Sequence, residues 1–190
     1  MKAIKIGIIA EDTGDVDVLK ILAAKLTKRR FSTSHFVGKG CGPLRKKIPG
    51  WCKAFSDKGI EAVVIVHDLD RNKEKELREL LENMLPEEGF TCMTVVIPTE
   101  ELEAWLLSDE VAIKTALKLH TAIKPMHHPE KIVSPKEHLG KLVRRHSKNQ
   151  LRQYVNTVDN MLIAKQLVIE KLKKCTSFKD FKSFVNAAIG

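Results

Sequence analysis

Residues 61–72 read EAVVIVHDLDRN, an uninterrupted apolar and mostly β-branched run followed closely by two aspartates. A run of this kind, bounded by polar residues, is typical of a strand buried on both faces of a parallel sheet. Residues 4–15, IKIGIIAEDTGD, repeat the arrangement, because a second apolar run ends in Glu11 and a polar turn. Together the two segments predict an α/β fold with acidic side chains at the ends of its strands.

Strands and helices alternate through the first half of the chain. We predict further strands over Phe31–Val37 and Thr91–Pro98, with helices in the segments between the strands. This βαβαβαβ order implies a Rossmann-like, mostly parallel four-stranded sheet between helices. The loops that follow the strands then open at one edge of the sheet, where α/β proteins place their functional sites.

After the last strand the spacing of apolar residues becomes helical. We predict a short helix over Glu100–Leu107 and a second one capped by Asp109. Ser134, followed by proline and then glutamate at the third helical position, marks the start of another helix. Leu151–Lys174 predicts a single long helix, and Ser177 caps a final one.

Charge divides the chain into two parts. Residues 1–119 contain 19 basic and 19 acidic residues, whereas residues 120–190 contain 14 basic and 5 acidic ones and so hold the whole net charge of +9. We therefore predict an α/β domain over residues 1–119 and a basic helical extension over residues 120–190 packed on it. A basic extension beside a neutral domain predicts a polyanion-binding surface. The alternative is a solvated, lysine-rich helical face.

Glu11, Asp68 and Asp70 form the main candidate site. Residues i and i+2 of an extended chain project to the same side, so the two aspartates can share one hard cation. Carboxylates gathered at one sheet edge repel each other unless they take up protons or bind a cation. The sequence therefore predicts a Mg²⁺ site, with Mn²⁺ as a substitute. The competing explanation, that each acid caps the helix that follows, accounts well for Asp15 and poorly for Glu11.

Composition excludes several other classes of protein. The four cysteines show no C-x₂-C spacing, which argues against a zinc site. No run of 18 apolar residues exists to span a membrane, and the N-terminus lacks the features of a signal peptide. We expect a cytoplasmic protein without a membrane partner.

Other side chains extend the candidate site. Glu101 and Glu103 either add ligands to the metal site or occupy the favourable first turn of a helix. Residues 38–42, GKGCG, form a flexible turn or a phosphate-binding loop, although they lack the G-K-[ST] of a P-loop. The predicted contacts to nucleic-acid phosphates are these: Lys39, Arg71, Asn72, Lys136, Lys141, Arg144 and Arg145.

Three segments, EDTGD at 11–15, DLDRN at 68–72 and PTEELEAWLLSD at 98–109, resemble the Toprim (topoisomerase–primase) superfamily. The resemblance is to small stand-alone Toprim-like proteins of mobile-element and phage-defence loci, and it covers roughly residues 3–110. Asp12 departs from the pattern, because the family has glycine at that position.

The resemblance implies a Toprim fold and metal-dependent phosphodiester chemistry, most simply a nuclease. Glu11 would be the general acid/base, Asp68 and Asp70 metal ligands, and Asp15 an additional ligand for a second metal. Two metals about 4 Å apart can stabilise the attacking and the leaving oxygen together. Lys136 is a further catalytic candidate, because a cation there could neutralise charge in the transition state.

Two alternatives stay open at this point. The first is a non-catalytic Toprim-like module that binds nucleic acid or a partner protein. The second is a receiver-like phosphoacceptor domain, although residues 98–101, PTEE, stand where a receiver has its lysine. The sequence does not choose between DNA and RNA, and it leaves room for a homodimer.

Overall fold

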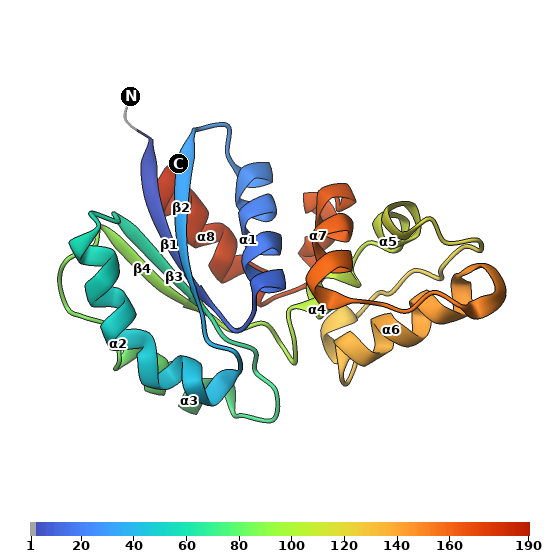
Figure 1. Ribbon diagram of the computed structural model, residues 1–190, viewed down its shortest axis with the longest axis horizontal. Helices are drawn as coiled ribbons and strands as arrows, with labels where there is room; N and C mark the ends of the chain where they lie inside the picture. The colour runs from blue at the N-terminus through green and yellow to red at the C-terminus, as the bar shows by residue number, and fades with distance from the viewer. Residues whose placement is uncertain (1–2) are drawn as a thin grey trace.

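A computed structural model describes residues 3–190 of the protein. One sheet contains all four strands: β1 (Ile4–Ala10), β2 (Phe31–Val37), β3 (Ala62–Val66) and β4 (Cys92–Val96). The strand order is β2-β1-β3-β4 and every neighbouring pair is parallel, as Figure 1 shows. The predicted α/β class with its four-stranded parallel sheet is therefore confirmed.

Helices cover both faces of the sheet. Four helices do so: α1 (Thr13–Leu26), α2 (Cys41–Asp57), α3 (Glu74–Glu82) and α8 (Phe178–Ile189). Alternate residues of the central strands enter two different cores, so that Val64 packs with α1 and α8 whereas Val63 and Ile65 pack with α2 and α3. Burial on both faces explains why the central strands are apolar without alternation.

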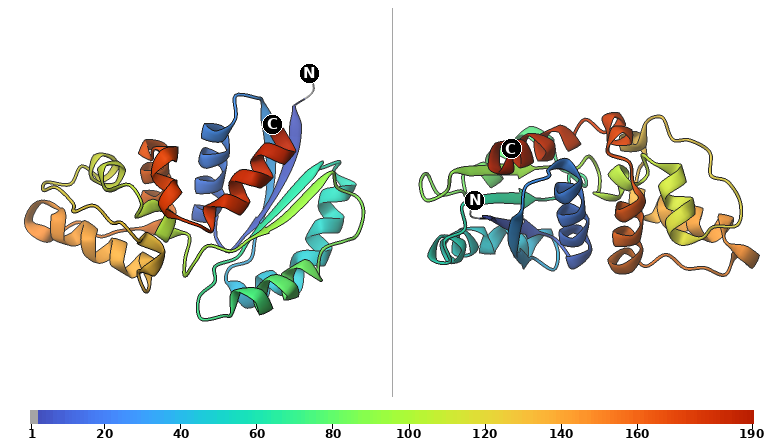
Figure 2. Two further views of the ribbon diagram at one scale, coloured as in Figure 1. Left: turned by 180° about the vertical axis from the view of Figure 1, so that it is seen from behind. Right: turned by 90° about the horizontal axis from the view of Figure 1, so that it is seen from above.

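The remaining helices form a lobe beside α1, visible in Figures 1 and 2. The lobe contains α4 (Glu103–Leu106), α5 (Glu110–Leu117), α6 (Pro135–His146) and α7 (Asn156–Gln166). Three 3₁₀ turns accompany them: η1 (Pro129–Lys131), η2 (Lys148–Gln150) and η3 (Ile169–Lys174). Apolar residues of the lobe continue the core on the α1–α8 face of the sheet, so one hydrophobic core joins the two parts.

The prediction of one long helix over Leu151–Lys174 is wrong. The chain has no helix over residues 151–155, α7 ends at Gln166, and only η3 follows. Tertiary contacts hold this break: the Lys25 ammonium donates to the carbonyl oxygens of Lys165 and Leu167 at 2.8 and 2.6 Å. These bonds satisfy acceptors at the helix end that a continuing helix would have used.

Two predicted helix caps have different outcomes. Asp109 caps α5 as predicted, because its Oδ1 accepts from the N–H groups of Val111 and Ala112. Ser177 precedes α8, but its hydroxyl accepts from the buried Trp105 indole N–H at 2.8 Å instead of capping the helix.

Within residues 3–190, no helix combines the length and the apolar character needed to cross a membrane.

Candidate metal-binding site

The acidic residues after β1 and β3 meet at the carboxyl edge of the sheet. The two strands are direct parallel neighbours, with Ile9 opposite Ile65, so the residues that follow them emerge side by side. The backbone N–H of Asp68 donates to Oε1 of Glu11 at 3.1 Å. The two segments that were predicted to share a site are therefore in direct contact.

Cys41 joins the two acidic segments from a third side. It is the first residue of α2, and its thiol lies 3.2 and 3.1 Å from the two Glu11 carboxylate oxygens and 3.2 Å from Oδ2 of Asp70. Gly38 allows this approach, because a Cβ at that position would lie 2.4 Å from the Cβ of Leu44. The helix N-terminus also places positive potential beside the Glu11 carboxylate.

His67 supports Glu11 from inside the protein. The side chain is fully buried, and its Nε2 lies 3.0 Å from the Arg45 Nε–H. Arginine only donates, so Nε2 is the unprotonated ring nitrogen and Nδ1 carries the hydrogen. That Nδ1–H donates to the Asp68 carbonyl oxygen at 2.7 Å and lies 3.5 Å from Oε1 of Glu11. His67 thus orients the acidic segments.

Asp68 and Asp70 are held by the loop that follows β4. Oδ1 of Asp68 accepts from the Leu102 N–H at 2.9 Å, and the Asp70 N–H donates to the Glu100 carbonyl oxygen at 3.0 Å. Asp70 and Glu100 both adopt left-handed backbone conformations, with φ of 49° and 62°. Such conformations are costly for residues other than glycine and persist where the surrounding structure fixes them.

Asp15 and Glu103 lie deeper, on α1 and α4, with only 7% and 3% of their surfaces exposed. Oε1 of Glu103 accepts from the Tyr154 hydroxyl at 3.2 Å and from the Asn160 amide at 3.0 Å. The helical lobe therefore helps to build the site. Asp15 forms a capping box with Asp12, so that Asp12, and not Asp15, is the cap of α1.

Asp12, the position at which the Toprim pattern has glycine, has a structural role. Its Oδ1 accepts from the Asp15 N–H at 3.0 Å, and its Oδ2 accepts from the Asn156 amide at 3.0 Å. These bonds start α1 at Thr13 and tie the turn to α7.

Burial and repulsion between neighbouring carboxylates raise the pKa values of Asp68 and Asp15. Burial and then the neighbouring charges of Asp15, Glu11, Glu103 and Asp70 raise the pKa of Asp68 well above its ordinary value. The pKa of Asp15 is raised in the same way, by burial first and then by Asp12 and Glu103. A cation placed among these groups would lower both pKa values again.

Glu101 has a structural role in addition to the ligand role predicted for it. Its Oε2 accepts from the Lys136 backbone N–H at 2.7 Å, so it caps α6 in place of Ser134, whose side chain makes no cap bond. Burial raises the pKa of Glu101 even so, with Glu103 and Asp70 adding to the shift. Its second oxygen remains available to a ligand.

The site offers donor atoms of two kinds. Glu11, Cys41 and His67 offer atoms within 4.8 Å of one another, a set that would suit zinc. Both ring nitrogens of His67 are engaged in hydrogen bonds, so His67 would have to give up one of them to bind a metal. Glu11, Asp68 and Asp70 carry carboxylate oxygens, which are the kind of ligand that Mg²⁺ and Mn²⁺ prefer.

The predicted phosphate contacts fall into two groups. Arg71 and Asn72 line a cavity of about 410 Å³ together with Asp70, Glu100, Glu101 and Ser134. Lys136 lies at the adjoining start of α6. Lys39 lies just after β2, and its backbone N–H donates to the Glu11 carbonyl oxygen at 2.9 Å. The other three residues, Lys141, Arg144 and Arg145, lie farther along α6.

Several residues of the site were not predicted from the sequence. His67 carries a recognisable signal, since it is a buried polar residue directly after an apolar buried strand. Cys41 stands in a glycine-rich loop that suggested phosphate binding and not contact with carboxylates. Tyr154 and Asn160 lie about 50 residues from Glu103 and have no local signal.

Comparison with known proteins assigns the chain to a family but does not indicate an activity. No curated protein and no solved structure gives a significant match to the chain. A family described as "Domain of unknown function (DUF4276)" matches residues 10–186, a range that includes every carboxylate of the site. The chain therefore belongs to the DUF4276 family.

Proposed function

We propose that this protein is a metal-dependent phosphodiesterase acting on nucleic acid, most simply a nuclease of the Toprim type. One observation carries the proposal. Six carboxylates gather at one edge of a parallel sheet, and within residues 3–190 none of them forms an ion pair with lysine or arginine: Glu11, Asp15, Asp68, Asp70, Glu101 and Glu103. Buried charges of one sign require protons or a cation.

The metal would be Mg²⁺, or Mn²⁺ in its place, held by Glu11, Asp68 and Asp70. When bound, such an ion polarises a phosphoryl oxygen and lowers the pKa of a coordinated water. Asp68 and Asp70 would hold the ion while Asp15, Glu103 and the free oxygen of Glu101 balance further positive charge.

Glu11 is the candidate general acid/base. Its carboxylate is fixed by the Asp68 N–H at 3.1 Å and by the Cys41 thiol at 3.1 to 3.2 Å. A fixed carboxylate can exchange a proton with a reacting oxygen without first paying the entropy of being ordered. Lys136, whose backbone N–H donates to Glu101, is the proposed cation for charge that develops on a phosphate.

Nucleic acid is the proposed substrate because the net charge of +9 lies entirely in residues 120–190. Contacts between basic residues and phosphates give affinity that falls steeply with salt and carries little sequence preference. The Toprim resemblance points in the same direction and suggests a cytoplasmic role in a defence or mobile-element system. DNA and RNA are both candidates.

The direct test is a cleavage assay with the purified protein. Supercoiled plasmid, single-stranded DNA and tRNA are incubated separately with Mg²⁺, with Mn²⁺ and with EDTA. We expect metal-dependent cleavage of at least one substrate and its loss in an Asp68→Ala, Asp70→Ala double variant. An Asp57→Ala, Glu88→Ala double variant removes the same charge from exposed positions outside the site and should retain activity.

The outcomes separate the alternatives. No cleavage by the wild type, with saturable metal and nucleic-acid binding, would replace the nuclease with a binding module. Stable labelling of Asp68 by a small phosphodonor, with no cleavage, would favour the receiver-like alternative. Cleavage that persists in the Asp68→Ala, Asp70→Ala variant would contradict the proposed site.

A further inference from the structure

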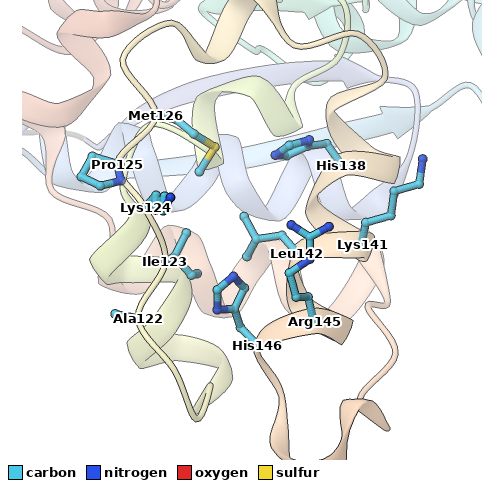
Figure 3. A pocket seen from close by; sticks show the side chains of 10 residues that line it. All are labelled: Ala122, Ile123, Lys124, Pro125, Met126, His138, Lys141, Leu142, Arg145 and His146. Carbon is cyan, nitrogen blue, oxygen red and sulfur yellow. The ribbon is translucent and has the colours of Figure 1, made fainter.

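A second cavity, of about 500 Å³, lies in the helical lobe between α6 and the segment that follows α5. Figure 3 shows the side chains around its opening. The lining residues are Ala122, Ile123, Lys124, Pro125 and Met126 from the segment, and His138, Lys141, Leu142, Arg145 and His146 from α6.

The α6 residues of this cavity form one stripe of the helix. His138, Leu142 and Arg145 follow one another at spacings of four and three residues, which places them on the same face. The segment opposite is fastened to the end of α6, because the His120 N–H donates to the His146 carbonyl oxygen at 2.8 Å. The Thr121 hydroxyl also lies 2.7 Å from Nδ1 of His146. The cavity is thus built between two connected segments.

Its chemistry combines an apolar floor with a basic rim. Ile123 and Leu142 are only 8% and 9% exposed and form the floor. Lys124, Lys141 and Arg145 are exposed and surround it, and no carboxylate lines the cavity. Lys141 has an ion pair with Glu137 at 3.5 Å, but both side chains are more than 70% exposed, so the pair is weak and can open.

The rim produces a positive potential inside the cavity. Burial, followed by the charges of Lys141 and Arg145, lowers the pKa of His138. His138 is therefore neutral at neutral pH, and it presents a flat imidazole on the same side of the cavity as Arg145, opposite the segment that carries Met126 in Figure 3. An anion entering the cavity would meet cations at the rim and apolar or flat side chains behind them.

We propose that this cavity binds a nucleotide, with its phosphate at Arg145 and Lys124 and its base over Ile123 and Leu142. Cavities of about 300–1,000 Å³ hold small ligands, and this volume falls in that range. Exposed bases stack on histidine rings and on arginine guanidinium planes, and both are present here. Inorganic phosphate alone would leave the apolar floor unused.

The cavity is separate from the carboxylate site and needs no metal. Arg145 lies nine positions after Lys136, the α6 residue at the carboxylate site. At a rise of 1.5 Å per residue this is about 14 Å along the helix. The nucleotide could be free or could be the phosphorylated end of a strand, and both sources present the same phosphate and base.

Calorimetric titration of the full chain in EDTA tests the proposal without interference from the carboxylate site. The probes are the four ribonucleoside 5′-monophosphates, adenosine, inorganic phosphate and a 5′-phosphorylated dinucleotide. We expect at least one monophosphate to bind saturably and more tightly than either adenosine or phosphate. A dinucleotide that binds more tightly than its mononucleotide would identify a strand end as the source, and weaker binding would identify a free nucleotide.

Two matched charge reversals locate the binding. Arg145→Glu should weaken nucleotide binding by about 10- to 100-fold, the range expected when a charge-assisted hydrogen bond is lost. Lys148→Glu makes the same change from a positive to a negative charge three residues farther along the chain, at an exposed position that does not line the cavity and is not a predicted phosphate contact, and should bind within about twofold of the wild type. Absence of saturable binding for all four monophosphates, or equal weakening by both variants, would overturn the proposal.

Discussion

The carboxylate site makes an unusual prediction about stability: Asp68→Asn should stabilise the metal-free protein at neutral pH. Asparagine keeps the shape of the side chain and an oxygen that can accept from the Leu102 N–H at 2.9 Å. It removes one negative charge from a cluster in which burial and four neighbouring acids raise the pKa of Asp68. The folded state is therefore relieved of repulsion that the unfolded chain does not have.

The size of the effect follows from the linkage between pKa and stability. Each unit by which folding raises the pKa of Asp68 corresponds to about 1.4 kcal/mol of free energy of unfolding lost at neutral pH. For a chain of this length, that corresponds to a rise in Tm of roughly 3–6 °C per unit when the charge is removed. Thermal unfolding in EDTA, followed by circular dichroism, measures it.

The dependence on pH has a definite sign. Above the unfolded pKa of about 3.9, the unfolded chain has released the Asp68 proton while the folded protein retains it. The free energy of unfolding of the wild type therefore falls as pH rises from about 3.9 through the raised folded pKa. The advantage of Asp68→Asn should be absent below pH about 3.9 and complete above the folded pKa.

Mg²⁺ should reverse the order of the two proteins. A ligand at 100 times its Kd stabilises the folded state by about 2.7 kcal/mol, and Asp68→Asn should lose most of this gain. The wild type then gains Tm on adding Mg²⁺ while the variant changes little. A variant that is less stable than the wild type in EDTA at neutral pH, and that gains as much from Mg²⁺, would refute the reasoning.

Three further substitutions test the supports of the fold and the site. His67→Gln should weaken Mn²⁺ binding in a fluorescence or calorimetric titration, because Glu11 loses a buried support; unchanged affinity would contradict the orienting role. Trp105→Phe leaves the Ser177 hydroxyl without its indole donor and should cost about 1–3 kcal/mol in urea denaturation, with no loss as the contrary result. Glu130→Gln should destabilise the protein at neutral pH and much less near pH 3. Bonds from Thr176 and Ser177 outweigh burial and lower the pKa of Glu130, so its contribution is present above the unfolded pKa of about 4.3 and is lost as pH falls through the folded pKa. An equal loss at both pH values would contradict this account.

The parts of the structure that the sequence predicts are those with strong local patterns. The two apolar runs at residues 4–10 and 61–67 specify buried parallel strands, and topology then places Glu11 beside Asp68 and Asp70. The carboxyl ends of parallel strands all lie at one edge of the sheet. Local sequence patterns that identify the strands are therefore enough to predict that acids following different strands lie close together.

The parts that the sequence did not predict depend on contacts between distant segments. Leu151–Lys174 has helical spacing, yet Lys25 and Asp109 bind backbone groups near residues 165–168 and end α7 there. Glu101 was predicted as a metal ligand, and its role as the cap of α6 depends on a partner 35 residues away. The helix propensity of a segment contains no information about hydrogen bonds to residues far away in the sequence, so it cannot predict where such bonds end a helix.

Metal binding is the central claim, and Mn²⁺ titration followed by electron paramagnetic resonance tests it most directly. The signal of free Mn²⁺ disappears on binding, so affinity and stoichiometry are read without any substrate. We predict saturable binding by the wild type, competition by Mg²⁺, and loss of binding in the Asp68→Ala, Asp70→Ala double variant. No saturable binding by the wild type, or equal binding by the double variant, would contradict the account.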